Sequence, residues 1–279
     1  QNSGYILFSF GMKTVKILFS FGSFIKIAPT PTGSHHHSAN ERYYRICLFV
    51  LYSTAFMYNV CYIYKDIDTM KNVDLVLGIL NEIVQFSFGS YTLVIASLFK
   101  KHQWHLFLKK LNTVHPNVYS DNYHYYIILA IFIFFVILIV NTYCWLVIIG
   151  TEVLNVYFVA IFQISNQLYY LLLTYAGAQE ILKLYQTQTT LLRTATRRSY
   201  NSTFKSVNYK LFLLEELVAI FNDIFGWPLL FCFLSVGSST VGYLNNLVRG
   251  GYASFFNSTT LFQLFVTTEL TLLLLLWVS

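Results

Sequence analysis

Apolar residues along this chain gather into six long stretches that short polar segments separate. A helix needs about 20 apolar residues to cross the hydrocarbon core of a bilayer, and every stretch is close to or above that length. The runs are too long for strands, and they lack the period-two alternation that strands of a membrane barrel show. The pattern predicts an all-α, polytopic transmembrane helix bundle over residues 46–279, after an N-terminal segment of residues 1–45. The expected spans are residues 46–64, 73–99, 126–150, 153–178, 219–248 and 255–278.

The polar segments hold further helical patterns. Residues 101–112 predict an amphipathic helix with Trp104, Leu108 and Leu111 on one face, and with Lys109 and Lys110 turned away from it. Apolar residues at helical spacing also continue the fourth stretch toward residue 194 and precede the fifth. We therefore expect these two helices to project beyond the membrane and to pack there. The connections that we expect are a polar loop at 194–206 and short outer loops at 65–72, 151–152 and 249–254.

The charges give this arrangement a direction. Hydrophobic residues make up 56% of the chain and charged residues 11%, whereas a soluble domain carries about 25% charged residues. Because basic residues collect in cytoplasmic loops, the charge pattern predicts a multi-pass plasma-membrane protein with a cytoplasmic N-terminus. The basic residues lie in loops and not on one soluble face, so we expect lipid and not nucleic acid as a partner. Fifteen of the eighteen Lys and Arg residues lie on one side: Lys13, Lys16, Lys26, Arg42, Arg45, Lys100, Lys101, Lys109, Lys110, Lys183, Arg193, Arg197, Arg198, Lys205 and Lys210.

Patterns typical of enzymes and metal sites are missing from the sequence. It has no glycine-rich phosphate loop ending in Lys-Ser or Lys-Thr, and no His-Glu-x-x-His pattern. The triplet His35-His36-His37 follows Gly-Ser in a polar loop, where solvated side chains are the simpler interpretation. The four cysteines all lie in apolar stretches and are interpreted as small hydrophobic residues. We therefore expect no enzyme activity, no metal and no cofactor.

Polar side chains inside the apolar stretches need a reason, because a carboxylate at the centre of a membrane helix costs about 2.5–3.5 kcal/mol. With the N-terminus inside, most of them fall in the outer halves of their helices. One interpretation is hydrogen bonding between helices that only holds the bundle together. For the set we predict instead a hydrated pocket that is open to the outside, ringed by aromatic side chains and suited to a small ligand. The candidate ligand-binding residues are Asn81, Glu82, Gln85, Asn141, Tyr143, Trp145, Asn155, Gln163, Ser238, Tyr243 and Gln263.

One string of residues is more specific. Residues 221–230 read Phe-Asn-Asp-Ile-Phe-Gly-Trp-Pro-Leu-Leu, where Pro228 predicts a bend, and they follow Glu215-Glu216-Leu217. With the segment Phe-Ile-Lys-Ile-Ala-Pro at 24–29 and the short outer loops, the chain resembles the insect gustatory receptor family. The resemblance implies a tastant-gated, non-selective cation channel, built as a homo- or hetero-tetramer of seven-helix subunits. It also implies a ligand pocket in the outer half of each subunit.

The chain departs from that family at its C-terminal end. The family's pore-lining seventh helix carries a Thr-Tyr-(five apolar)-Gln-Phe signature, which is absent here, so no pore residue can be assigned. We expect a chain truncated before the seventh helix. A G-protein-coupled receptor would place its N-terminus outside, against the charge pattern. An odorant receptor subunit remains an alternative, as does a small-molecule transporter, although the two halves show no repeat. The tastant, a sugar or a bitter compound, and the subunit composition stay open.

Overall fold

The computed structural model describes residues 10–24, 28–29, 38–63, 72–114, 123–150, 153–194 and 200–255, and this part of the chain is all-α, as predicted. The last predicted span, from residue 256 onward, lies outside the described residues. So do the triplet His35-His36-His37 and the connections at 65–71 and 151–152. The helices are α1 (Phe10–Phe24), α2 (Ser38–Ile63), α3 (Asn72–Ser90), the π-helix η3 (Tyr91–Phe99), α4 (Lys101–Val114), α5 (Tyr123–Ile149), α6 (Val153–Thr194) and α7 (Tyr200–Phe255).

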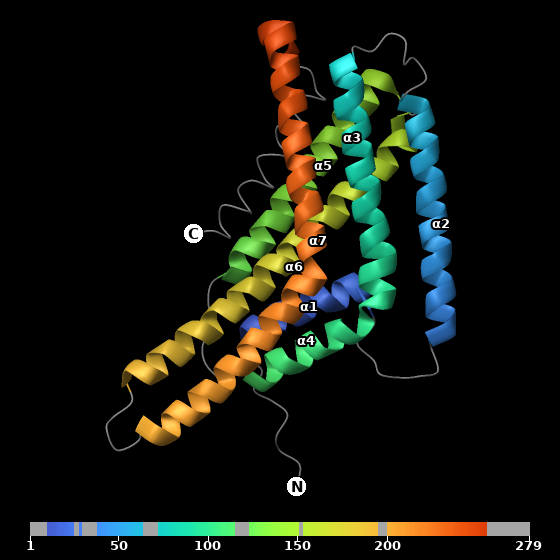
Figure 1. The fold of residues 1–279 in the computed structure, drawn as a ribbon. Helices are drawn as coiled ribbons and strands as arrows, with labels where there is room; N and C mark the ends of the chain where they lie inside the picture. The colour runs from blue at the N-terminus through green and yellow to red at the C-terminus, as the bar shows by residue number, and fades with distance from the viewer. Residues whose placement is uncertain are drawn as a thin grey trace.

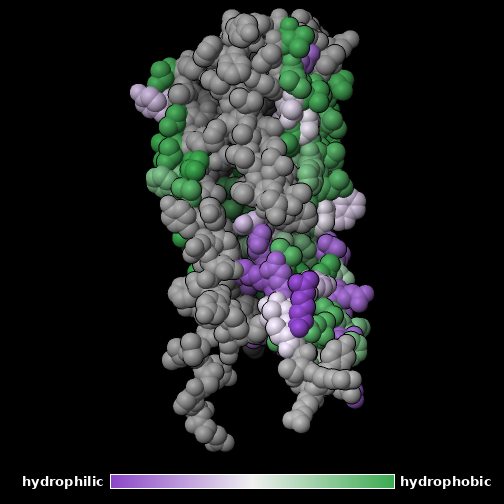
Figure 2. Space-filling view, turned by 90° about the vertical axis from the view of Figure 1, so that its left-hand side faces the viewer, coloured by the Kyte–Doolittle hydropathy of each residue, from purple (hydrophilic) through white to green (hydrophobic). Residues whose placement is uncertain are grey.

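The helices form an elongated bundle with two different ends (Figure 1). Helices α2 and α3 run antiparallel, and α1 and α4 lie across one end of the bundle, to which the C-terminal end of α6 and the start of α7 also extend. We call this the basic end, because it holds Lys16, Arg42, Arg45, Lys100, Lys101, Lys109, Lys110, Lys183, Arg193, Lys205 and Lys210. Figure 2 shows the same division on one face, with hydrophilic residues gathered in the lower half and hydrophobic ones above.

Two helical stretches in the described part of the chain are long and apolar enough to cross a membrane. They are Leu75–Phe99, which joins α3 to η3, and Phe204–Gly242 within α7. The first contains residues 75–99 of the span predicted at 73–99, and the second contains residues 219–242 of the span predicted at 219–248. This finding rests on length and composition. In the 18 residues of each stretch that carry it, 50% and 33% of the residues are buried, so much apolar surface is exposed.

The basic end is held together by an aromatic core. Trp104 of α4 is 1% exposed, and its ring lies 5.3 Å from Phe19 of α1 and 5.2 Å from Phe225 of α7. Its indole Nε1 donates a hydrogen bond of 3.0 Å to the carbonyl oxygen of Ala96 in η3. The predicted amphipathic face of α4 is thus confirmed for Trp104 and Leu111, which are both buried. One aromatic side chain joins four elements.

Helices α6 and α7 are the longest elements, with 42 and 56 residues, and they pack against each other. Figure 1 shows α7 changing direction near its middle, where Pro228 lies. A proline inside a helix removes one backbone hydrogen bond and crowds the preceding turn, which accounts for the bend.

Three local predictions are wrong. The predicted loop at 194–206 is shorter, because α7 already begins at Tyr200. The predicted outer loop at 249–254 is helical, since α7 continues to Phe255. The glycines of this segment do not end the helix, because glycine lowers helix propensity by only about 1 kcal/mol relative to alanine and an existing helix propagates at low cost. Lys110 does not turn away from the bundle but pairs with Glu216 of α7.

We predict that Trp104→Ala lowers the melting temperature of the protein in detergent micelles sharply. The substitution removes a buried ring and a hydrogen bond, and truncations of this kind cost about 3–5 kcal/mol. Trp227→Ala is the matched control, because Trp227 is 55% exposed and should tolerate the change. Equal melting temperatures for the two variants, measured by thermal unfolding, would contradict the packing described for α4.

Candidate ligand site

A network of polar side chains lies between α3, α6 and α7, with Gln85 at its centre. The Gln85 side-chain nitrogen donates to Ser235 Oγ at 2.8 Å, and its oxygen accepts a hydrogen bond of 2.7 Å from Gln167 Nε2. One turn away, Ser238 Oγ donates to Asn81 Oδ1 at 3.3 Å. These residues share one face of α3 and one face of α7 because positions three or four apart in a helix lie above one another.

The network continues to α2 through Tyr52. Its hydroxyl donates to the backbone carbonyl of Gln85 at 3.3 Å and accepts from Gln163 Nε2 at 3.2 Å. Deeper in the bundle, Asn166 Nδ2 donates to Thr92 Oγ1 at 2.7 Å, and the Thr92 hydroxyl donates to the carbonyl of Gly89. Four helices and η3 therefore exchange polar contacts in one region.

An aromatic cluster forms one wall of this region. Tyr52 stacks on Phe86 with ring centroids 5.9 Å apart and planes 9° apart, and Phe162 of α6 lies 5.7 Å from Tyr52. The close approach depends on Gly89, because a Cβ atom there would lie 2.4 Å from the Tyr52 hydroxyl. Polar groups and ring faces thus meet at the same place, which is the composition of many sites for small ligands.

The structure brings together some of the predicted site residues. Asn81, Gln85, Gln163 and Ser238 are joined by the network, and Glu82 is next to Asn81 on α3 with its Oε2 atom buried. Tyr143 of α5 is 67% exposed and makes no described contact with these residues. Outside the described residues lie Gln263 and the side chains of Asn141, Trp145, Asn155 and Tyr243.

Sequence reasoning missed several members of the network. Gln167, Asn166 and Ser235 are also polar residues in apolar helices, and their spacing from Gln163 and Ser238 at three or four residues was the available signal. Tyr52 and Thr92 gave no such signal, because tyrosine and threonine are common in apolar helices. Their roles depend on the register between helices.

Ion pairs join the end of η3 and helix α4 to α7 at the basic end. Lys100, the first residue after η3, lies 2.8 Å from Asp223 Oδ1, and Lys110 pairs with Glu216. Partial burial acts to lower the pKa of Lys100, but its hydrogen bonds to Asp223 and Tyr91 and their charges outweigh burial, so the pKa lies above its usual value. Lys100 is therefore charged at neutral pH and fixes the end of η3 on α7.

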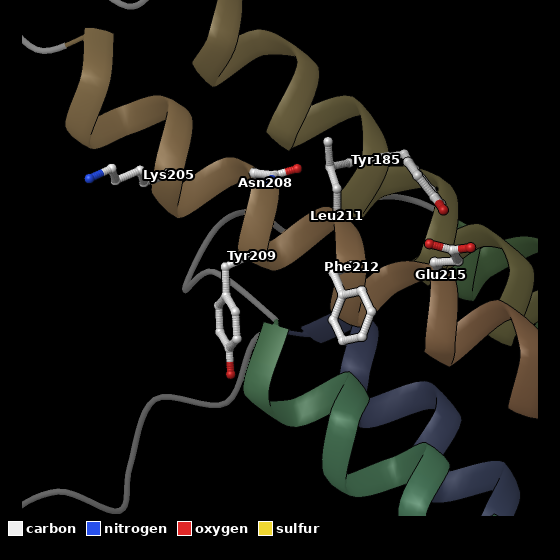
Figure 3. A pocket seen from close by; sticks show the side chains of 7 residues that line it. All are labelled: Tyr185, Lys205, Asn208, Tyr209, Leu211, Phe212 and Glu215. Atoms are coloured by element: carbon white, nitrogen blue, oxygen red, sulfur yellow. The ribbon is translucent and has the colours of Figure 1, made fainter.

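A separate groove of about 730 Å³ lies on the basic end between α6 and α7. Figure 3 shows Tyr209 and Phe212 pointing toward α4, Lys205 at one end of the groove, and Tyr185 and Glu215 together at the other. Six of its lining residues come from α7 and Tyr185 comes from α6. The groove shares no residue with the polar network.

We predict that Gly89→Ala destabilises the bundle by about 1–3 kcal/mol, the usual cost of overpacking. The new methyl group must displace the Tyr52 ring and so weakens its hydrogen bond with Gln163. Gly226→Ala is the control in another helix, since nothing lies within 4 Å of a Cβ atom there and an alanine should be neutral or slightly stabilising. Thermal unfolding of both variants in micelles measures the difference, and an unchanged Gly89→Ala melting temperature would refute the close approach.

Comparison with known proteins adds nothing to this geometry. No family model matches the chain, and no curated protein or solved structure matches it either. The candidate ligand site therefore rests on the contacts between α2, α3, α6 and α7 alone.

Proposed function

We propose that the chain is a subunit of a ligand-gated, non-selective cation channel of the insect gustatory receptor type. In this proposal the chain crosses the plasma membrane six times, and its N-terminus is cytoplasmic. The observation that carries the proposal is the polar network around Gln85, placed between apolar helices and beside aromatic rings. An insect odorant receptor subunit is the second candidate, since its architecture would be similar.

The two ends of the bundle support the proposed orientation. The basic end would face the cytoplasm, as basic residues next to membrane helices do. Gln85 lies near the middle of the α3–η3 path, and the Asn81–Ser238 contact extends the network one turn further from the basic end, on the side that would be closer to the exterior. A ligand that enters from outside would reach this part of the bundle first.

The network also offers a way to couple ligand binding to gating. A ligand shifts a conformational equilibrium only if it binds one state better than the other. A ligand that replaces hydrogen bonds of Gln85 would change how α3 contacts α6 and α7. The same two helices, α3 through η3 and α7, meet again at the Lys100–Asp223 pair on the basic end. Rotation of either helix would therefore change both the contacts of the Gln85 network and the Lys100–Asp223 pair.

The channel proposal predicts ligand-evoked current that does not depend on G proteins. The full-length receptor containing this chain is expressed in cultured cells and challenged with sugars and bitter compounds under whole-cell recording. Current should persist when G-protein signalling is blocked, and cells without the receptor provide the baseline. Current that disappears under the blockade would refute the channel.

The orientation predicts that Asn201, in the sequence Asn-Ser-Thr at the start of α7, carries no glycan, because glycosylation takes place on the outer side of the membrane. Wild type and Asn201→Gln should then migrate equally after glycosidase treatment or without it. An acceptor sequence inserted into the connection at 65–71 should be glycosylated and serves as the positive control. A glycan on Asn201 would refute the orientation.

A further inference from the structure

Two buried oxygen atoms, one in the last two turns of α2 and one near the middle of α3, take no part in the hydrogen bonds of the polar network. Asn59 is 4% exposed, and its Oδ1 atom accepts no hydrogen bond from the described part of the chain. Glu82 Oε2 is also buried and likewise without a donor there. Buried acceptors are almost always paired in folded proteins, so each of these two oxygen atoms calls for a donor.

The register of α2 against α3 brings these two residues to the same level. Tyr52 and Phe56 both contact Phe86, the latter with ring centroids 4.7 Å apart. One turn beyond Phe56 toward the end of α2 lies Asn59, and one turn before Phe86 toward the start of α3 lies Glu82. Because the helices run antiparallel, both steps lead in the same direction.

The chemistry of this place favours a positively charged donor. An amide oxygen and a carboxylate oxygen can only accept hydrogen bonds, and the rings of Phe56 and Phe86 lie one turn below them. An ammonium group carries several N–H donors and a positive charge that balances the negative charge of the carboxylate. The faces of aromatic rings also attract cations. A neutral hydroxyl supplies a single donor and no charge. An organic amine supplies the N–H donors, the positive charge and the attraction to the rings together.

We propose that Asn59 and Glu82 bind the ammonium group of an organic amine, with Phe56 and Phe86 as the aromatic wall. The site deepens the proposed receptor function and rests on it in one respect, since it names the ligand class that would open the channel. The Gln85 network then lies directly beside the bound ligand, because Glu82 and Gln85 are three residues apart on α3.

Binding of radiolabelled phenethylamine to the full-length receptor in lipid nanodiscs tests the proposal. We expect saturable binding that 2-phenylethanol, the neutral analogue, does not displace. Glu82→Gln keeps the size of the side chain and removes its charge, so affinity should fall at least about tenfold, as expected for a lost charged hydrogen bond. Ile83→Ala is the control on the next residue, which is 58% exposed, and should leave affinity unchanged.

A second variant tests the site from the opposite direction. Asn59→Asp preserves the shape of the side chain and adds a second carboxylate, so affinity for phenethylamine should rise. The ammonium site is overturned if saturable binding is missing, if 2-phenylethanol competes as well as the amine, or if affinity stays unchanged in both Glu82→Gln and Asn59→Asp.

The amine site and the channel can fail separately. Current evoked by other compounds, with no amine binding, would overturn the amine site and leave the channel. Saturable amine binding at Glu82 in a receptor that passes no ligand-evoked current would overturn the channel and leave the site.

Discussion

An amide side chain among apolar helices must find partners for both of its polar atoms, and Gln85 meets this constraint with two different helices. Its nitrogen is held by Ser235 of α7 and its oxygen by Gln167 of α6. A buried polar group without a partner costs about 1–3 kcal/mol, so the three helices are restrained to one relative rotation and height. Tyr52 adds α2 to the same arrangement through the Gln85 carbonyl. The positions of the aromatic wall and of Glu82 follow from this register.

Helix α7 carries that restraint to the basic end of the bundle. Ser235 lies about two turns after Pro228, and Asp223 lies somewhat more than one turn before it. Above the bend α7 is tied to Gln85, and below it to Lys100. Since α3 and η3 form one continuous helical path between those two contacts, α3–η3 and α7 make a closed frame with a bend in one side. A change at the network has to appear either as a change of that bend or as strain at the Lys100–Asp223 pair.

The sequence predicted the helical class and most of the helix extents, because length and period are properties of local residues. It did not predict the π-helix η3, since a stretch that is almost wholly apolar has too few polar residues to reveal its period. Polar residue types such as Gln85 and Ser238 could be singled out by their apolar surroundings. The pairing of these residues could not be predicted, because Gln85 contacts Gln167 only through a tertiary register that joins positions 82 residues apart. The same applies to Asn59, whose neighbour on α3 depends on the contact between Phe56 and Phe86.

Helix α5 shows why depth in a helix is not enough to place a residue in a site. It contains no Asp, Glu, Lys or Arg, and most of its described side chains are exposed, among them Phe132, Ile139 and Val147. A helix that is apolar all round and yet exposed needs an apolar surrounding, which a lipid bilayer would supply. Tyr143 is at the depth expected for the pocket but lies on this exposed surface, and the neighbouring Thr142 hydroxyl is used by its own helix, at the Leu138 carbonyl. A ligand at the Gln85 network would therefore be enclosed by α2, α3, α6 and α7, with the outer surface of α5 left to lipid.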